Sequence, residues 1–297
     1  MYLYYFLALL AAFSWSIASL ISTDIIRNIG SLNFNRLRLI FVSLMLVSYA
    51  YYQNTWDTIN VEYLNLIILS GIVGIFIGDT FLFIALKRIG PRRNNILFSL
   101  AAPFTVVLNI IILQQKMTNL EILGCILVFF GVVVAIAYGN NKKNKHRWEL
   151  IEGSIKFGIV MAISAALCQS IGLIIIKPIL NQGADPIAAA AIRTTISAFL
   201  LSFTFVSSFN KVSSSLFFNP IIILKIILSG FLGMALGMSL LLISLQKADA
   251  GIVATLSSTG PIMILFILWI YTKKIPALGA WIGTIIAIFG TGLIFIN

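Results

Sequence analysis

Long apolar runs separated by short polar connections restrict the fold of this chain more than any other feature. Each run is close to the roughly 20 residues that an α-helix needs to cross a bilayer, whereas a membrane β-strand shows about 10 residues of alternating polarity. Moreover, 60% of the residues are hydrophobic and only 10% are charged, against about 45–50% and 25% in soluble domains. The pattern predicts an all-α integral membrane protein, because helices satisfy their own backbone groups in lipid.

Charges and turn residues between the runs set the bounds of ten predicted transmembrane helices. These cover residues 4–23, 35–52, 64–86, 94–114, 121–138, 156–176, 187–208, 221–246, 251–272 and 276–296. The second and seventh helices are the least clear, because each has an arginine near its start. The first run begins directly at Tyr2 and has no basic leading segment. We therefore expect it to be retained as a helix and not cleaved as a signal peptide.

Similar residues recur in the two halves of the chain at a nearly constant offset. The row Gly71, Gly74 and Gly78 returns as Gly230, Gly233 and Gly237, Ser99 and Pro103 return as Ser257 and Pro261, and Arg38 returns as Arg193. This predicts two five-helix repeats, residues 1–139 and 154–297, joined by a basic linker over residues 140–153. Because five is odd, the second repeat would be inverted. Inverted repeats are frequent in secondary transporters, where the binding site lies near the midplane.

The formal charge of +11 reflects membrane topology in this reading. Most Lys and Arg residues lie in the connections after odd-numbered helices, and the positive-inside rule places those connections in the cytoplasm. We expect a multi-pass protein of the cytoplasmic (inner) membrane with both termini outside the cytoplasm. A nucleic-acid partner, a metal and a cofactor are not expected. The expected partners are a small-molecule substrate and the lipid bilayer, and a monomer is compatible with this organisation.

Asp79 is the single acidic residue well inside a predicted span. A charge near the centre of a membrane helix costs about 2.5–3.5 kcal/mol, so such a group usually faces a cavity or a partner. It could bind a cationic substrate group or a coupling proton. Alternatively, it could form a structural ion pair with Arg38, Arg92 or Arg93. Arg193, like Arg38, could bind a substrate carboxylate, or it could reach the interface and fix the depth of its helix.

Further polar residues inside spans are candidate substrate contacts. They are Ser14, Trp15, Ser99, Gln169, Ser257 and Ser258. The last two and Ser99 precede Pro261 and Pro103, and a proline inside a span removes a hydrogen bond and bends the helix. The hydroxyls could form a polar binding surface or merely satisfy helix carbonyls. The glycine rows could allow close helix packing, or they could clear space beside a cavity.

Two segments resemble the conserved block of the EamA family in the drug/metabolite transporter superfamily. They are Ser70–Leu113 (SGIVGIFIGDTFLFIALKRIGPRRNNILFSLAAPFTVVLNIIIL) and Ser229–Tyr271, which has LQKADAGIVATLSSTGP at its centre. In each, a Gly-rich helix, a short basic turn and a Pro-containing helix follow one another. The resemblance implies a ten-helix carrier with alternating access and a central cavity. Where the family often has a glutamate after the fourth and ninth helices, this chain has Gln115 and Lys273, so no role for that carboxylate is carried over.

These observations predict a secondary transporter, in particular an exporter of small polar metabolites such as amino acids. The sequence has no nucleotide-binding loop of the Walker type, which argues against direct use of ATP. A lipid-moving protein or a carrier of nucleotide derivatives with the same fold is the alternative. An enzyme is not expected, because Asp79 has no second acid, histidine or metal-ligand cluster beside it in the spans.

Overall fold

The computed structural model describes residues 1–138, 153–204, 219–272 and 278–296, which form helices and short connections without any strand. The main helices are α1 (Tyr2–Ile29), α2 (Ser31–Tyr52), α3 (Leu64–Gly71), α4 (Gly78–Phe98), α5 (Ala101–Ile112), α6 (Asn119–Tyr138), α7 (Ile155–Asn181), α8 (Pro186–Thr204), α10 (Pro220–Gly230), α11 (Gly237–Lys247), α12 (Ala250–Ser257), α13 (Gly260–Thr272) and α14 (Leu278–Ile296). Except for Gly153, the predicted linker 140–153 lies outside the described residues, as does Lys273.

Within the described residues, five helical segments are long and apolar enough to cross a membrane. They are Tyr2–Thr23, Val61–Pro91, Ile155–Asn181, Pro186–Phe203 and Pro220–Lys247. Shorter apolar segments, among them Ala101–Ile112 and Asn119–Val134, accompany them. Many large apolar side chains on these helices are exposed, including Phe130, Phe199 and Ile285. An exposed apolar surface of this kind matches a lipid environment, so the helical fold is that of a membrane protein.

The first two helices are longer than predicted. α1 continues to Ile29, and Gly30, with a φ of 84°, separates it from α2, which begins at Ser31. Ile25, Ile26 and Ile29 are buried, so tertiary packing extends the helix beyond the apolar run. As a result, Arg27, which falls in the predicted first connection, lies inside α1.

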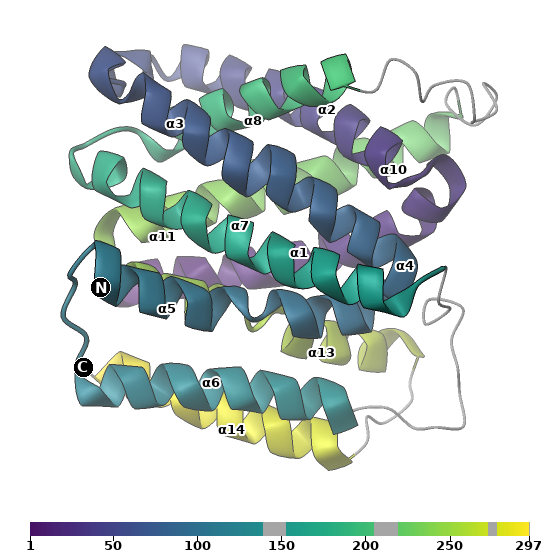
Figure 1. Ribbon diagram of the computed structural model, residues 1–297, viewed down its shortest axis with the longest axis vertical. Coiled ribbons are helices and arrows are strands. Elements are labelled where there is room, and N and C mark those ends of the chain that lie inside the picture. Colours follow the sequence, from purple (N-terminus) through teal and green to yellow (C-terminus); the bar gives the residue numbers. More distant parts are fainter. Residues whose placement is uncertain (139–152, 205–218, 273–277, 297) are drawn as a thin grey trace.

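Helices from the two halves interlock (Figure 1). α1 packs against α10 and α11, and in the corresponding manner α7 packs against α3 and α4. Equivalent helices of the two halves also pair with each other, α2 with α8 and α6 with α14, and α5 packs against α12. The α2–α8 pair and the α6–α14 pair lie at opposite sides of the molecule, and both chain termini lie at the same end of the helices (Figure 1).

α6 and α14 run antiparallel and meet through glycines. A Cβ at Gly124 would lie 2.8 Å from the carbonyl oxygen of Gly290, and a Cβ at Gly131 would lie 2.6 Å from that of Gly283. The contacts advance along α6 while they recede along α14, which defines the antiparallel direction. Because real Cβ atoms do not approach this closely, the two backbones can touch only where glycine is present.

The long spans are irregular at matching places in the two halves. A π-helical segment, η3 (Ile72–Ile77), joins α3 to α4, and its counterpart η6 (Phe231–Leu236) joins α10 to α11. Turns at residues 99–100 and 258–259 separate α5 and α13 from the helices before them. Gly90, with a φ of 77°, bends α4. Gly30 and Gly90 adopt positive φ values, which glycine reaches without the steric cost of a Cβ.

The turns give Pro103 and Pro261 a different position from the one predicted. Each lies in the first turn of its helix, α5 or α13, directly after the break. A proline at this position costs no helical hydrogen bond and favours helix initiation. The prolines therefore start the second part of a broken span and do not bend a continuous one.

Candidate functional site

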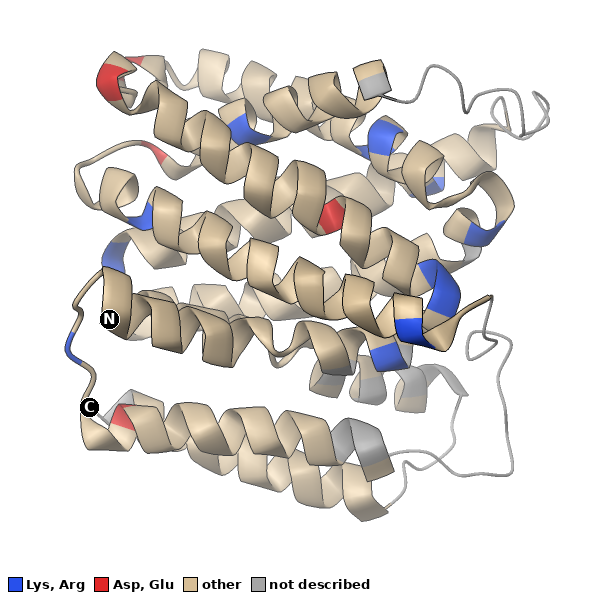
Figure 2. Cartoon of the chain, in the orientation of Figure 1, with Lys and Arg blue, Asp and Glu red and all other residues tan. Residues whose placement is uncertain are grey.

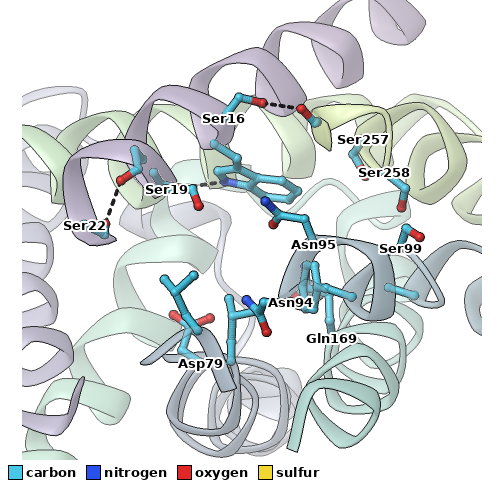
Figure 3. A pocket seen from close by; sticks show the side chains of 18 of the residues that line it. Ser16, Ser19, Ser22, Asp79, Asn94, Asn95, Ser99, Gln169, Ser257 and Ser258 are labelled. Atoms are coloured by element: carbon cyan, nitrogen blue, oxygen red, sulfur yellow. Dashed lines mark hydrogen bonds between the residues drawn. The ribbon is translucent and has the colours of Figure 1, made fainter. Parts of the chain in front are cut away.

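A cavity of about 140 Å³ lies between the two halves. Its wall combines residues of α1, α4, α7, η6, α11, α12 and α13, with Arg38 of α2 and Ala101 of α5. Apolar lining residues include Leu82, Phe83, Leu86, Phe98, Leu173, Met234 and Ile264. The polar residues face the same space from several directions (Figure 3).

Six of the eight candidate substrate contacts line this cavity. They are Trp15, Asp79, Ser99, Gln169, Ser257 and Ser258. Ser14 and Arg193 do not line it. Ser14 is buried, and its Oγ donates a hydrogen bond to the carbonyl oxygen of Leu232, 2.6 Å away. It therefore attaches α1 to η6 and does not face the cavity.

Polar residues that were not among the eight candidate contacts also line the cavity. They are Ser16, Ser19, Ser22, Asn94 and Asn95. The three serines recur every third residue of α1, which places them on one face of the helix, so their spacing was a usable signal. The two asparagines follow a pair of arginines at the start of the predicted helix 94–114. In the structure they lie in α4 after the bend at Gly90, and both line the cavity.

Trp15 connects the cavity to the π-helical segment of the second half. Its indole Nε1 donates a hydrogen bond to the carbonyl oxygen of Gly233, at 2.6 Å. A Cβ at Gly237 would lie 2.6 Å from the same nitrogen. A π-helix shifts the hydrogen-bond register of the backbone and is common at functional sites. Here the side chains of α1 use two carbonyls of η6, which holds the indole ring at the cavity wall.

Asp79 and Arg38 form a salt bridge through Oδ2 and Nη2. Their side chains are only 14% and 7% exposed. The same Nη2 donates to Asn35 Oδ1 at 3.0 Å, and the guanidinium lies 4.6 Å from the ring centroid of Phe83. Both residues also line the cavity. The ion pair that was one of the two sequence alternatives is therefore present, and it forms part of the candidate site.

The side chain of Arg193, on α8, is fully buried inside the protein and does not reach the membrane–water interface. A Cβ at Gly71 would lie 2.8 Å from the Cα of Arg193, so the two helices are in close contact. Its Nη1 lies 3.7 Å from the Sδ of Met238, and Met238 lines the cavity. Arg193 is therefore located directly behind the cavity wall.

The hydroxyls at the second break have helix carbonyls as partners. Ser257 Oγ and Ser258 Oγ both donate to the carbonyl oxygen of Ala254, at 3.0 and 2.8 Å. As acceptors they still present oxygen lone pairs to the cavity (Figure 3). Ser99 occupies the matching place at the first break and is 3% exposed.

The glycine rows mainly provide close packing. A Cβ at Gly74 would lie 3.3 Å from the Cα of Gly172, and a Cβ at Gly233 would lie 3.0 Å from the Cβ of Ala18. Ser70 Oγ donates to the carbonyl oxygen of Gly172 at 2.7 Å, across the same contact between α3 and α7. Gly233 in addition lines the cavity. Small residues let these helices approach closely enough for backbone contacts.

Apolar helices around an internal cavity that both apolar and polar residues line define a polytopic membrane protein. Comparison with known proteins then identifies the family. The model of the EamA-like transporter family matches residues 2–137 and again residues 156–296. The chain therefore belongs to the EamA-like transporter family, and the resemblance inferred from the two conserved blocks is confirmed.

Two individual proteins are also similar to this chain. The "Uncharacterized transporter YyaM" of Bacillus subtilis (strain 168) is 34% identical over 73 residues, a segment that spans 25% of this chain and 24% of that protein. A chain described as "Crystal structure of protein" superposes with a TM-score of 0.78 at 14% identity, covering 98% of this chain and 95% of the other. At that identity the likeness shows a shared fold.

Proposed function

We propose that this protein is a secondary transporter that exports small polar metabolites, such as amino acids, by alternating access. The observation that carries the proposal is the cavity between the two halves, whose largely apolar wall contains a set of polar side chains. It has the scale of a small solute, about 140 Å³. Serine, asparagine and glutamine side chains offer it neutral donors and acceptors, as sites for small polar ligands do.

The proposed architecture is ten spans in two inverted repeats, residues 1–139 and 154–297, joined by the linker 140–153. Matching irregularities support it, because η3 and η6 and the two broken spans occupy equivalent places. The antiparallel α6 and α14 support opposite orientations of the repeats. Termini at the same end of the helices fit an even number of spans (Figure 1).

The distribution of charge supports one orientation in a cytoplasmic membrane. Lys and Arg residues gather mostly at the end of the helices opposite both termini (Figure 2). By the positive-inside rule this basic end faces the cytoplasm, and the termini face outward. We propose this orientation for a protein that acts as a monomer.

Alternating access requires contacts that can separate at one end of the molecule. Lys177 Nζ donates to the carbonyl oxygens of Leu245 and Ala248, at 2.6 and 2.8 Å, and so holds α7 to the connection between α11 and α12. Asn109 Nδ2 donates to both carboxylate oxygens of Asp249, at 3.1 and 3.0 Å, and holds α5 to α12. These bonds lie beyond the cavity toward the end that we assign to the outside. Their opening would release the solute there.

An efflux assay with a blocked cavity tests the proposal. Ser258→Phe places a ring in the cavity wall, and we expect it to reduce efflux of a labelled metabolite panel from cells by about tenfold or more, since it removes space for the solute. Ser48→Phe is the matched control, because Ser48 lies on an exposed face of α2. Both variants should reach the membrane in equal amounts. If no metabolite leaves faster with the wild-type protein than without it, the transport proposal is wrong.

A further inference from the structure

Arg193 is a buried cation whose hydrogen-bonding capacity is largely unused. The side chain is 0% exposed, and within the described part of the chain its Nε and Nη2 atoms have no hydrogen-bond partner. Its Nη1 contacts only a thioether, Met238 Sδ, which is a weak acceptor. A guanidinium is always charged, and burying its donors without partners is unfavourable. An anion that reached this residue would be bound strongly.

Comparison of the two repeats shows that, among the described residues, Arg193 lacks the acidic neighbour that Arg38 has. Arg38 and Arg193 correspond in the two halves, and so do Asp79 and Met238. Arg38 pairs with the carboxylate of Asp79, whereas Arg193 contacts the thioether of Met238. The second half thus repeats the cation of the first but not its anion. Asp79 interacts electrostatically with both guanidinium groups, so two positive charges share one negative charge beside the cavity.

Met238 separates Arg193 from the cavity. It lines the cavity while its sulfur lies against the guanidinium. A methionine side chain is unbranched and has three rotatable bonds, so it can repack without movement of the backbone. Displacement of this one side chain would open the unpaired Nε and Nη2 to a ligand. Arg38 is less available to a ligand, because Asp79 and Asn35 already accept hydrogen bonds from its Nη2.

We propose that the cavity selects solutes with an anionic oxygen group, a carboxylate or a phosphate monoester, and that Arg193 binds this group after Met238 moves aside. The ligand anion takes the place against Arg193 that Asp79 takes against Arg38. Guanidinium binds both kinds of oxyanion with two parallel hydrogen bonds. This inference rests on the proposed transport function and specifies the class of substrate.

The test uses the purified full-length protein and matched solute pairs. Amino acids are compared with their carboxamides, and glycerol phosphate is compared with glycerol, by thermal shift and by binding of labelled solute. We expect stabilisation by the member with the oxyanion in at least one pair, and about tenfold or more weaker binding of the counterpart that lacks the oxyanion. The pair that responds distinguishes a carboxylate from a phosphate.

Two substitutions at Met238 sharpen the test. Met238→Asp supplies the missing carboxylate, so we expect a higher Tm without ligand and about tenfold or more weaker binding of the anion, because Arg193 is then occupied. Asparagine has nearly the same shape as aspartate but no charge. We therefore expect Met238→Asn to cause no such rise in Tm and a much smaller loss of affinity for the anion. Arg193→Gln should also abolish the preference for the anionic member of the pair.

The outcomes separate this inference from the transport proposal. Equal binding of anionic and neutral solutes, or an undiminished anion response in Met238→Asp, would overturn the role of Arg193 while leaving transport of polar solutes intact. A protein that neither binds nor moves any solute of the panels would overturn both. A rise in Tm together with loss of anion binding in Met238→Asp, and not in Met238→Asn, would support the inference.

Discussion

At the scale of single residues, the site combines neutral hydrogen-bonding groups with a small number of buried charges. Trp15 and Ser14 use backbone carbonyls of η6, and the serines at the second break use the carbonyl of Ala254. The charged side chains of Asp79 and Arg38 differ from these neutral groups, because they pair with each other and also line the cavity. An ion pair in such a place can exchange its partner for a solute or a proton, whereas the carbonyl contacts fix geometry.

Asp79 is the residue through which we expect coupling to a proton gradient. Asp79→Asn keeps an oxygen that can accept from Arg38, but it cannot gain and lose a proton at physiological pH. In proteoliposomes, we therefore expect gradient-driven transport to fall about tenfold or more while solute exchange without a gradient persists. Asp57→Asn, at an exposed acid outside the spans, is the matched control. Unchanged gradient-driven transport in Asp79→Asn would exclude this role.

At the scale of helices, glycine contacts and breaks determine how the elements meet. The η3–α7 and α1–η6 contacts involve glycine or alanine on both sides, which gives smooth surfaces. Helices with such surfaces can shift against each other with small changes in packing. The broken spans place backbone turns beside the cavity, where non-helical backbone is tolerated inside a membrane.

The contact between α6 and α14 provides a prediction for stability. A Cβ at Gly131 would lie 2.5 Å from the amide nitrogen of Ala287, so Gly131→Ala must push the two helices apart. We expect a loss of about 1–3 kcal/mol in unfolding free energy, typical of overpacking. Gly292→Ala is the control, since nothing lies within 4 Å of its added Cβ, and we expect it to be neutral or slightly stabilising. Denaturant or thermal unfolding in detergent measures both, and equal effects would contradict the packing model.

At the scale of the whole molecule, the two halves enclose the cavity only together. α1 of the first half packs on α10 and α11, and α7 of the second packs on α3 and α4. Each half therefore completes the wall formed by the other. If one half rocked against the other during a transport cycle, these contacts between the halves would change.

The orientation of the molecule can be tested with reporters. An enzyme active only outside the cytoplasm, fused after Asn297, should be active. The same reporter inserted into the predicted basic linker 140–153 should be silent, because we assign that connection to the cytoplasm. Activity in the opposite pattern would reverse the orientation and with it the direction of the proposed gate.

How far the site was predictable depends on the kind of residue. Residues set apart by local contrast, such as Asp79 in an apolar run or serines next to a proline, could be identified from the sequence. Asn94 and Asn95 could not, because polar residues directly after two arginines at the start of a predicted span look like ordinary helix-end residues, whereas in the structure they follow the bend at Gly90 and line the cavity. The extension of α1 to Ile29 likewise depends on the burial of Ile25 and Ile26.

By itself, the sequence determined that this chain is a helical membrane protein with related halves. Span length, charge content and repeated residues can all be read directly from the order of residues along the chain. The tertiary structure alone decided that Asp79 pairs with Arg38, while Arg193 lies behind Met238 with no acidic partner in the described part of the chain. The reason is physical: which residues face a cavity depends on the rotation of each helix and on where it breaks. Both follow from packing between segments that are far apart in the chain.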